Sequence, residues 1–146
     1  MRNKTILATL LAAATIAVSG IAGAQDANIA GRWKTLDDKT GKPMTITEVY
    51  LAKNGTYAAK IVENLGLPAT CADCSGKYKN QPTVGIVTLW NLKPIKGGYG
   101  GGNGYKPSED REFKVKSVKL SADGKKLEVT GCVAFICRTA EWVRAN

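Results

Sequence analysis

The chain has no histidine among its 146 residues. Histidine is the usual general base at neutral pH and a common metal ligand, so its absence excludes Ser–His and Cys–His nucleophile pairs and imidazole metal sites. The nucleophile motif G-x-S-x-G is also missing, and only four serines follow residue 24. We therefore expect no catalytic residues and a protein that is not an enzyme.

Phosphate-binding motifs are missing as well. Residues 97–104 are rich in glycine, but they contain no G-x-G-x-x-G and no Lys followed by Ser or Thr. Lys106-Pro107 leads into an expected strand, whereas a phosphate loop leads into a helix. We expect residues 93–107 to form a glycine-rich loop at a barrel mouth, where Tyr99 and Tyr105 can touch a ligand.

The first 24 residues have the three parts of a secretory signal peptide. Arg2 and Lys4 precede an uncharged run over residues 5–22, and Ala22-Gly23-Ala24 supplies the small residues of a cleavage site. An uncleaved anchor is the alternative, because the run is just long enough to span a bilayer. We expect cleavage, leaving one domain of 122 residues (25–146) that is periplasmic or secreted and not stably inserted in a membrane.

From residue 25 onward the chain has 19 Lys and Arg residues and 12 Asp and Glu residues, which gives a net charge of +7. The lysines are spread along the chain without a dense block, which is typical of a solvated surface and predicts no nucleic-acid partner. A salt-screened attraction to an anionic component of the cell envelope is compatible with this charge. The sequence sets no oligomeric state.

All four cysteines, Cys71, Cys74, Cys132 and Cys137, follow the signal segment. An even number in an oxidising compartment predicts disulfides, and we favour local 71–74 and 132–137 bridges over a cross-link between the pairs. The C-x-x-C of the first pair also allows a thiol–disulfide oxidoreductase. Zinc is disfavoured because the pairs are 57 residues apart and the second is C-x4-C, so we expect no metal and no cofactor.

The chain after residue 24 reads as short strands, with no helical segment. Asn54-Gly55 and Ser121–Gly124 predict hairpin turns, and a break in alternation at Ser117-Val118 predicts a bulge. About seven strands joined as hairpins predict an all-β, small antiparallel barrel, because closure hides the sheet edges. The expected strands cover residues 29–35, 44–51, 56–62, 83–92, 112–120, 126–132 and 138–144.

Gly31-Arg32-Trp33 opens the first expected strand, and Trp142-Val143-Arg144 ends the last. In a closed meander these strands are neighbours, so Gly31, Trp33 and Arg144 are expected to close the barrel through a cation–π contact. The pattern resembles the lipocalins and calycins, in which an arginine from the far end of the barrel covers a G-x-W tryptophan.

The chain also resembles a bacterial family, domain of unknown function 2147, over nearly all of residues 29–144. The matching segments are Gly31–Thr35, Asp38–Pro43, Cys71–Cys74, Gly85–Val87, Gly131–Thr139 and Trp142–Arg144. Residues 104–110 depart from the family pattern. The resemblance implies a lipocalin-like barrel in the periplasm and no particular activity.

Two functional hypotheses lead from this fold. The first is non-catalytic binding of a small hydrophobic ligand or an envelope component, with Glu48, Tyr50, Tyr57 and Trp90 as candidate ligand-binding residues. Glu48 faces the interior only if it lies on the inner side of its strand; an outward Glu48 is equally compatible with the pattern. The second is an interaction module with a filled barrel that binds a protein or an anionic polymer through its basic surface.

Overall fold

The computed structural model describes residues 28–146, so the predicted signal peptide lies outside the described residues. This part of the chain forms strands and two short 3-10 helices, η1 (Gly76–Tyr78) and η2 (Pro107–Glu109). The strands are β1 (Gly31–Leu36), β2 (Pro43–Leu51), β3 (Tyr57–Asn64), β4 (Val87–Ile95), β5 (Gly98–Gly100), β6 (Asn103–Lys106), β7 (Arg111–Leu120), β8 (Lys126–Val133) and β9 (Ile136–Arg144).

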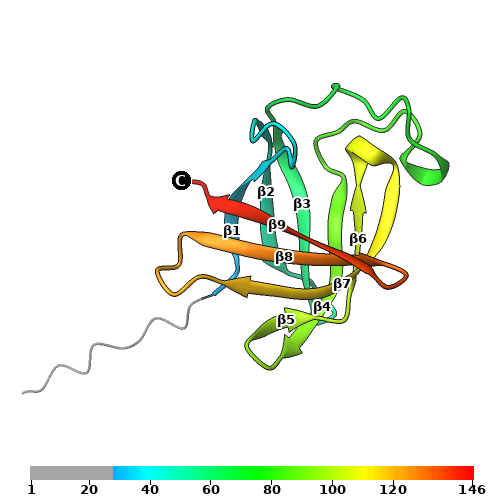
Figure 1. The fold of residues 1–146 in the computed structure, drawn as a ribbon. Coiled ribbons are helices and arrows are strands. Elements are labelled where there is room, and N and C mark those ends of the chain that lie inside the picture. The colour runs from blue at the N-terminus through cyan, green and yellow to red at the C-terminus, as the bar shows by residue number, and fades with distance from the viewer. Residues whose placement is uncertain (1–27) are drawn as a thin grey trace, which may run out of the picture.

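The strands form one antiparallel sheet that closes on itself (Figure 1). Every strand except β5 pairs with the next strand along the chain, and β1 pairs with β9 through Trp33–Arg144 and Lys34–Val143. The predicted all-β antiparallel barrel is therefore confirmed. Closure leaves few unpaired edges, which is what a hairpin-rich chain needs to avoid edge-to-edge association.

The glycine-rich segment is part of the barrel wall, so the prediction of a loop over residues 93–107 was wrong. β5 and β6 continue one another in the same register, and both lie between β4 and β7. A side chain at Gly100 would collide with the Lys116 carbonyl, and one at Gly102 with the Trp90 carbonyl. Glycine here permits close approach of neighbouring backbones. The barrel thus has eight strand positions, with β5 and β6 sharing one.

Most turn predictions are confirmed, but the strand expected from residue 83 starts four residues later. Asn54-Gly55 lies in the β2–β3 turn, where Gly55 has φ +80°, and Gly124, at φ +71°, lies in the β7–β8 turn. The bulge expected at Ser117-Val118 occurs just before it, between Val115 and Ser117. β4 begins at Val87 and not at residue 83, because Gly85 has φ +103° and interrupts the extended chain.

Large apolar side chains fill the barrel interior around the G-x-W tryptophan. Trp33, Leu89, Leu92 and Leu127 are fully buried, and Val49 is 2% exposed. Each side chain of this kind stabilises the fold by about 1.5–3 kcal/mol on burial. A fully buried side chain also leaves no water-sized space beside it, so this part of the barrel is occupied by its own residues.

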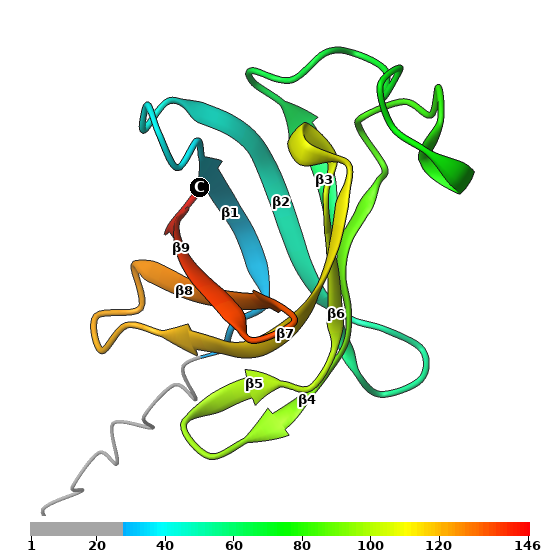
Figure 2. The same cartoon turned by 45° about the vertical axis from the view of Figure 1, so that its right-hand side comes forward.

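Connections between antiparallel neighbours alternate between the two ends of the barrel. The β2–β3, β4–β5 and β7–β8 turns lie at one end, which we call the turn end. The β1–β2, β3–β4 and β6–β7 connections lie at the other, the loop end (Figure 2). The alternation of strand direction assigns the β8–β9 turn to the same end. The Cys71–Cys74 disulfide lies in the β3–β4 connection, and Cys132–Cys137 joins β8 to β9 beside their turn.

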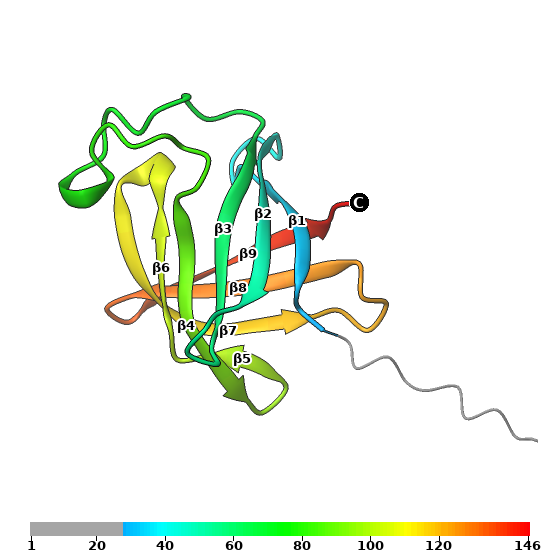
Figure 3. The same ribbon diagram turned by 180° about the vertical axis from the view of Figure 1, so that it is seen from behind.

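The long β3–β4 connection folds into a lobe beside the barrel (Figure 3). Its buried Cys71 and Cys74 pack with Ile86 and Tyr105 in a second apolar cluster. Tyr78 of η1 stacks on Tyr105, with ring centroids 3.7 Å apart. Because Tyr105 lies on the strand face opposite the barrel core, the lobe covers the outside of β6, so this connection is an ordered part of the structure.

Candidate functional site

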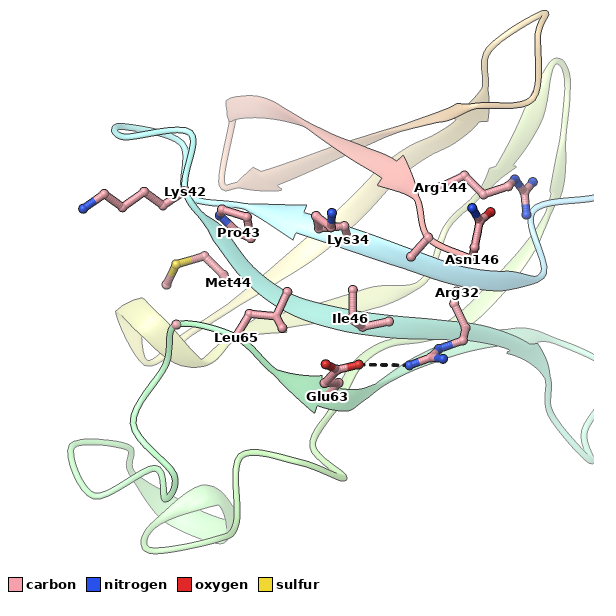
Figure 4. Close-up of a pocket in the computed structure, with 12 residues that line it drawn as sticks. Arg32, Lys34, Lys42, Pro43, Met44, Ile46, Glu63, Leu65, Arg144 and Asn146 are labelled. Carbon is pink, nitrogen blue, oxygen red and sulfur yellow. Dashed lines mark hydrogen bonds and ion pairs between the residues drawn. The ribbon is translucent and has the colours of Figure 1, made fainter.

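A groove crosses the outer face of β1, β2 and β3 (Figure 4). Strand alternation creates it: Trp33 points into the barrel, so its neighbours Arg32 and Lys34 point outward. Ile46 is paired with Lys34 and therefore lies on the same outer face of β2. Although it faces outward and lines the groove, Ile46 is only 6% exposed.

The groove has a volume of about 780 Å³ and combines an apolar floor with a basic rim. Met44 and Ile46 of β2, with Leu65 after β3, supply the floor. Charged side chains rise around them in Figure 4, with Lys42 at one end of the groove and Arg32 at the other. The remaining lining comes from Lys34, Pro43, Glu63, Gly66, Arg144, Ala145 and Asn146.

The cations of the rim outnumber its carboxylates. Arg32 donates to Glu63 across 3.2 Å, a half-exposed pair that is stabilised only weakly. Lys34 and Lys42 form no ion pair with any residue of the described range 28–146. Two uncompensated ammonium groups therefore border an apolar surface, an arrangement suited to a ligand that carries an anionic group on an apolar body.

The residues expected to close the barrel lie together at the turn end. The Arg144 guanidinium is centred 4.1 Å from the Trp33 ring centroid, and the Trp33 indole nitrogen donates to the Ile29 carbonyl at 2.8 Å. Arg144 also donates to the backbone carbonyls of Gly124, Ala30 and Asn28. Its guanidinium is thus held by the N-terminal segment, although the residue borders the groove.

The four candidate ligand-binding residues are not brought together. Glu48 and Tyr50 lie on the outer face of β2, not in the interior, and Lys60 of β3 approaches both. The Lys60 ammonium is 3.9 Å from the Glu48 carboxylate and 5.1 Å from the Tyr50 ring centroid. Of the two orientations that the sequence leaves open for Glu48, the structure has the outward one, because Trp33 and Thr47 take the inner face at this level.

The other two candidates, Tyr57 and Trp90, lie apart from these and from each other. Tyr57 packs edge-on against Tyr99, and its hydroxyl donates to Asn28 at 3.2 Å. Trp90 lies on the outer face of β4 and borders a second groove of about 540 Å³ formed with the β3–β4 connection. The Lys77 ammonium lies 5.5 Å from the Trp90 ring centroid. No single pocket of the described residues therefore unites the four.

The cysteines form the two local disulfides, Cys71–Cys74 and Cys132–Cys137. Cys71 and Cys74 are 7% and 3% exposed, and Cys71 lies against the Tyr105 hydroxyl. Burial restricts attack by an external thiol, so this geometry disfavours the oxidoreductase alternative. Among the described residues, no group of three or more His, Cys, Asp or Glu side chains is placed to hold a metal ion.

Hydrogen bonds between the connections shift several pKa values at the loop end. Hydrogen bonds from the Ser75 side chain and amide, and then from Tyr105, lower the pKa of Asp110. Burial, followed by the hydrogen bond to Asp110, raises the pKa of Tyr105. These contacts link the β3–β4 connection to the β6–β7 connection, and we assign them a structural role.

A second network joins the β1–β2 connection to β6. Lys106 pairs with Asp38 at 2.6 Å and with Glu109 at 2.8 Å. Burial acts to lower the pKa of Lys106, but the hydrogen bonds to the two carboxylates raise it overall. The Lys106 bond is also the main reason that the pKa of Glu109 is lowered. Together the two networks hold three of the four connections at the loop end.

The sequence analysis missed the groove residues Arg32, Lys34, Lys42, Met44 and Ile46. A signal was present in the first strand, where Arg32 and Lys34 flank the inward tryptophan. The apolar Met44 and Ile46 alternate with Thr45 and Thr47, so either face of that strand can be read as inner. Which face lies outward depends on pairing with β1, which the sequence alone does not determine.

The sequence comparison assigns the chain to a family. The family model described as "Uncharacterized protein conserved in bacteria (DUF2147)" matches residues 31–144. The chain belongs to this family. The range matched by the DUF2147 model begins at Gly31 and ends at Arg144, two of the three residues expected to close the barrel. No curated protein matches the chain.

A solved structure shows the same fold as this DUF2147 chain. It is protein HP1028 of Helicobacter pylori, described as belonging to the lipocalin family. The identity is 24%, the match covers 82% of this chain and 84% of that chain, and the TM-score is 0.68. The likeness shows the fold alone: a lipocalin-like barrel.

Proposed function

We propose that this protein is a non-catalytic binding protein for a small anionic amphipathic molecule, such as a lipid-derived acid of the cell envelope. The groove across β1–β3 is the observation that carries the proposal. Its Met44 and Ile46 floor suits an alkyl chain. Lys34 and Lys42, which form no ion pair within residues 28–146, suit a carboxylate or phosphate. The absence of histidine from the whole chain supports binding without catalysis.

An exported location is part of the proposal. The charged, apolar and small-residue segments of residues 1–24 support secretion, and two disulfides are compatible with an oxidising compartment. In residues 28–146, no helix is long and apolar enough to cross a membrane. N-terminal sequencing of the protein recovered from a cell fraction tests both cleavage after Ala24 and the compartment.

A paired-ligand titration tests the binding function. A fluorescent fatty acid and its methyl ester share one alkyl chain and differ in charge, so the difference in their affinities reports the contribution of the basic rim. We expect the acid to bind more tightly than the ester at low salt. The double variant Lys34→Gln/Lys42→Gln should bind the acid roughly three- to ten-fold more weakly, because exposed ion pairs each contribute little.

A charge-matched control separates the groove from the overall charge. Lys93→Gln/Lys96→Gln removes the same two charges at the β4–β5 turn, away from the groove. It should leave both affinities unchanged, whereas Met44→Gln should weaken acid and ester alike. Equal loss of acid binding in the two double variants would contradict a specific site, and it would favour the alternative of a filled barrel that interacts through its general basic surface.

A further inference from the structure

The β8–β9 hairpin ends in an apolar tip that projects into solvent. Phe135 is 93% exposed, Ile136 is 63% exposed and Val133 is 45% exposed. Residues 133–136 thus place three large apolar side chains at one point of the surface. Scattered single apolar residues are ordinary on a protein surface, but a contiguous set marks a contact site.

The turn chemistry of this tip is unusual for its geometry. Ala134 and Phe135 form the two-residue turn between β8 and β9, and Ala134 has φ +51°. Glycine, asparagine or aspartate normally occupies the positive-φ positions of such turns. Ala134 adopts a backbone conformation that alanine disfavours, and Phe135 exposes an apolar ring to water. The needs of the turn therefore do not explain why these two residue types occur here.

A disulfide braces the base of the tip. Cys132 and Cys137 are directly paired across the hairpin and bonded, immediately before the Val133–Ile136 pair. The cross-link keeps the two strands together at the point where the hairpin leaves the barrel. The apolar side chains are therefore presented in a fixed arrangement, which reduces the entropy lost when they bind a partner.

Cations surround the base of the tip. Arg138 follows Cys137 on β9 and is exposed, and Lys114 of β7 is paired with Cys132. Arg138 and Arg111 both lie near enough to Glu109 to lower its pKa, and that carboxylate is itself paired with Lys106. Three cations, Arg111, Lys114 and Arg138, thus lie near the base of the tip, beside the carboxylate of Glu109, in a chain that carries +7 after residue 24.

We propose that the β8–β9 tip docks the protein reversibly on an anionic phospholipid surface. Phe135 and Ile136 enter the boundary between headgroups and acyl chains, and Arg138, Arg111 and Lys114 face the phosphates. An apolar tip with a basic collar matches a membrane interface, which offers an apolar layer beneath a negative one. This inference is independent of the groove and does not require the proposed binding function.

Vesicle co-sedimentation of the protein tests the proposal. We expect binding to vesicles of equimolar phosphatidylcholine and phosphatidylglycerol, and much weaker binding to phosphatidylcholine alone. Phe135→Ser/Ile136→Ser should lower the partition coefficient about ten-fold or more, because two large apolar side chains no longer leave water. Arg138→Gln should weaken binding to the anionic vesicles only.

Leu51→Ser is the matched control, because Leu51 is 60% exposed at the turn end, opposite the tip. It should leave vesicle binding unchanged. In Phe135→Trp, lipids brominated on the acyl chain should quench the new indole. Equal partitioning of the tip variant and the Leu51→Ser control would overturn the proposal. So would self-association that the tip variant abolishes without any vesicle binding, since the occupant would then be a second copy.

The groove and the tip can fail separately. If the tip variant loses vesicle binding but keeps its affinity for the fluorescent fatty acid, the docking proposal stands whatever the groove binds. If Lys34→Gln/Lys42→Gln loses vesicle binding and the tip variant does not, the basic rim is the membrane contact and the tip proposal is overturned.

Discussion

Arg144 covers the Trp33 indole, with its guanidinium 4.1 Å from the ring centroid, and so joins the last strand of the barrel to the first. Only two residue pairs connect β1 and β9. The contact therefore reinforces the junction of β1 and β9, which we call the seam of the barrel. Backbone pairing is short there, so side-chain interactions must supplement it. The same arginine donates to carbonyls on both sides of the seam, Ala30 and Gly124.

Arg144→Ala should destabilise the protein by about 2–3 kcal/mol, since it removes a cation–π contact and several hydrogen bonds to backbone carbonyls. Arg144→Lys should lower the free energy of unfolding by less, because lysine keeps the positive charge. It should still destabilise the protein, because lysine lacks the planar fork that reaches both carbonyls. Urea unfolding followed by tryptophan fluorescence measures both values. Equal stability of all three proteins would show that the seam does not depend on this side chain.

Gly31→Ala should also destabilise the barrel, by about 1–3 kcal/mol, because Gly31 has φ +122°, which L side chains rarely adopt. The added Cβ would lie 3.0 Å from the Arg144 guanidinium nitrogen and would push it off the indole. Gly85→Ala is the closer control, since Gly85 has a similar φ of +103° but has nothing within 4 Å of the added atom. The difference between their unfolding free energies isolates the contact with Arg144.

Limited reduction should open the two disulfides in a fixed order. Cys137 is exposed at the β8–β9 hairpin, whereas Cys71 and Cys74 are buried under the β3–β4 lobe. A reducing thiolate must reach a sulfur atom, so Cys132–Cys137 should be reduced first. Alkylation after short exposures to dithiothreitol, with peptide mass spectrometry, gives the order. Earlier alkylation of Cys71 or Cys74 would contradict the placement of the lobe.

Acid should weaken the link between the β3–β4 and β6–β7 connections. The folded-state pKa of Asp110 lies below its ordinary 3.8, so the carboxylate stabilises the fold above that pH. The contribution is lost as the pH falls through the lowered value. Asp110→Asn should therefore melt below wild type at pH 7, and the gap should narrow below about pH 3.8. A gap that is constant with pH would show that the charge of Asp110 plays no part.

Features governed by local chemistry could be predicted from the sequence. The Asn54-Gly55 turn, the inward Leu127 and Val129, and the meeting of the first and last strands follow from turn preference, alternation and closure. The strand formed by the glycine-rich segment could not be predicted from the sequence. Its glycines are needed because backbone carbonyl groups of β4 and β7 approach them closely, and those strands are separate segments of the chain. Composition alone describes that segment as a loop.

The candidate site was harder to predict than the fold for a similar reason. The groove depends on which side chains from three strands share one outer face, and the face assigned to Ile46 and Glu48 is set by pairing with β1. The sequence analysis left both orientations of Glu48 open and named Tyr50, Tyr57 and Trp90 as aromatic residues available for a pocket. The interior is instead filled by residues such as Trp33 and Leu89.

The two disulfides lie away from the seam at which the first and last strands of the barrel meet. The seam between the first and last strands is held by hydrogen bonds and the Trp33–Arg144 stack, whereas one disulfide lies in the β3–β4 connection and the other joins β8 to β9 beside their turn. Neither disulfide crosses the seam between β1 and β9, so we expect the barrel to close without oxidation. We expect a fully reduced chain to keep the β-sheet signal of the oxidised protein and to lose protection from amide exchange in the β3–β4 lobe.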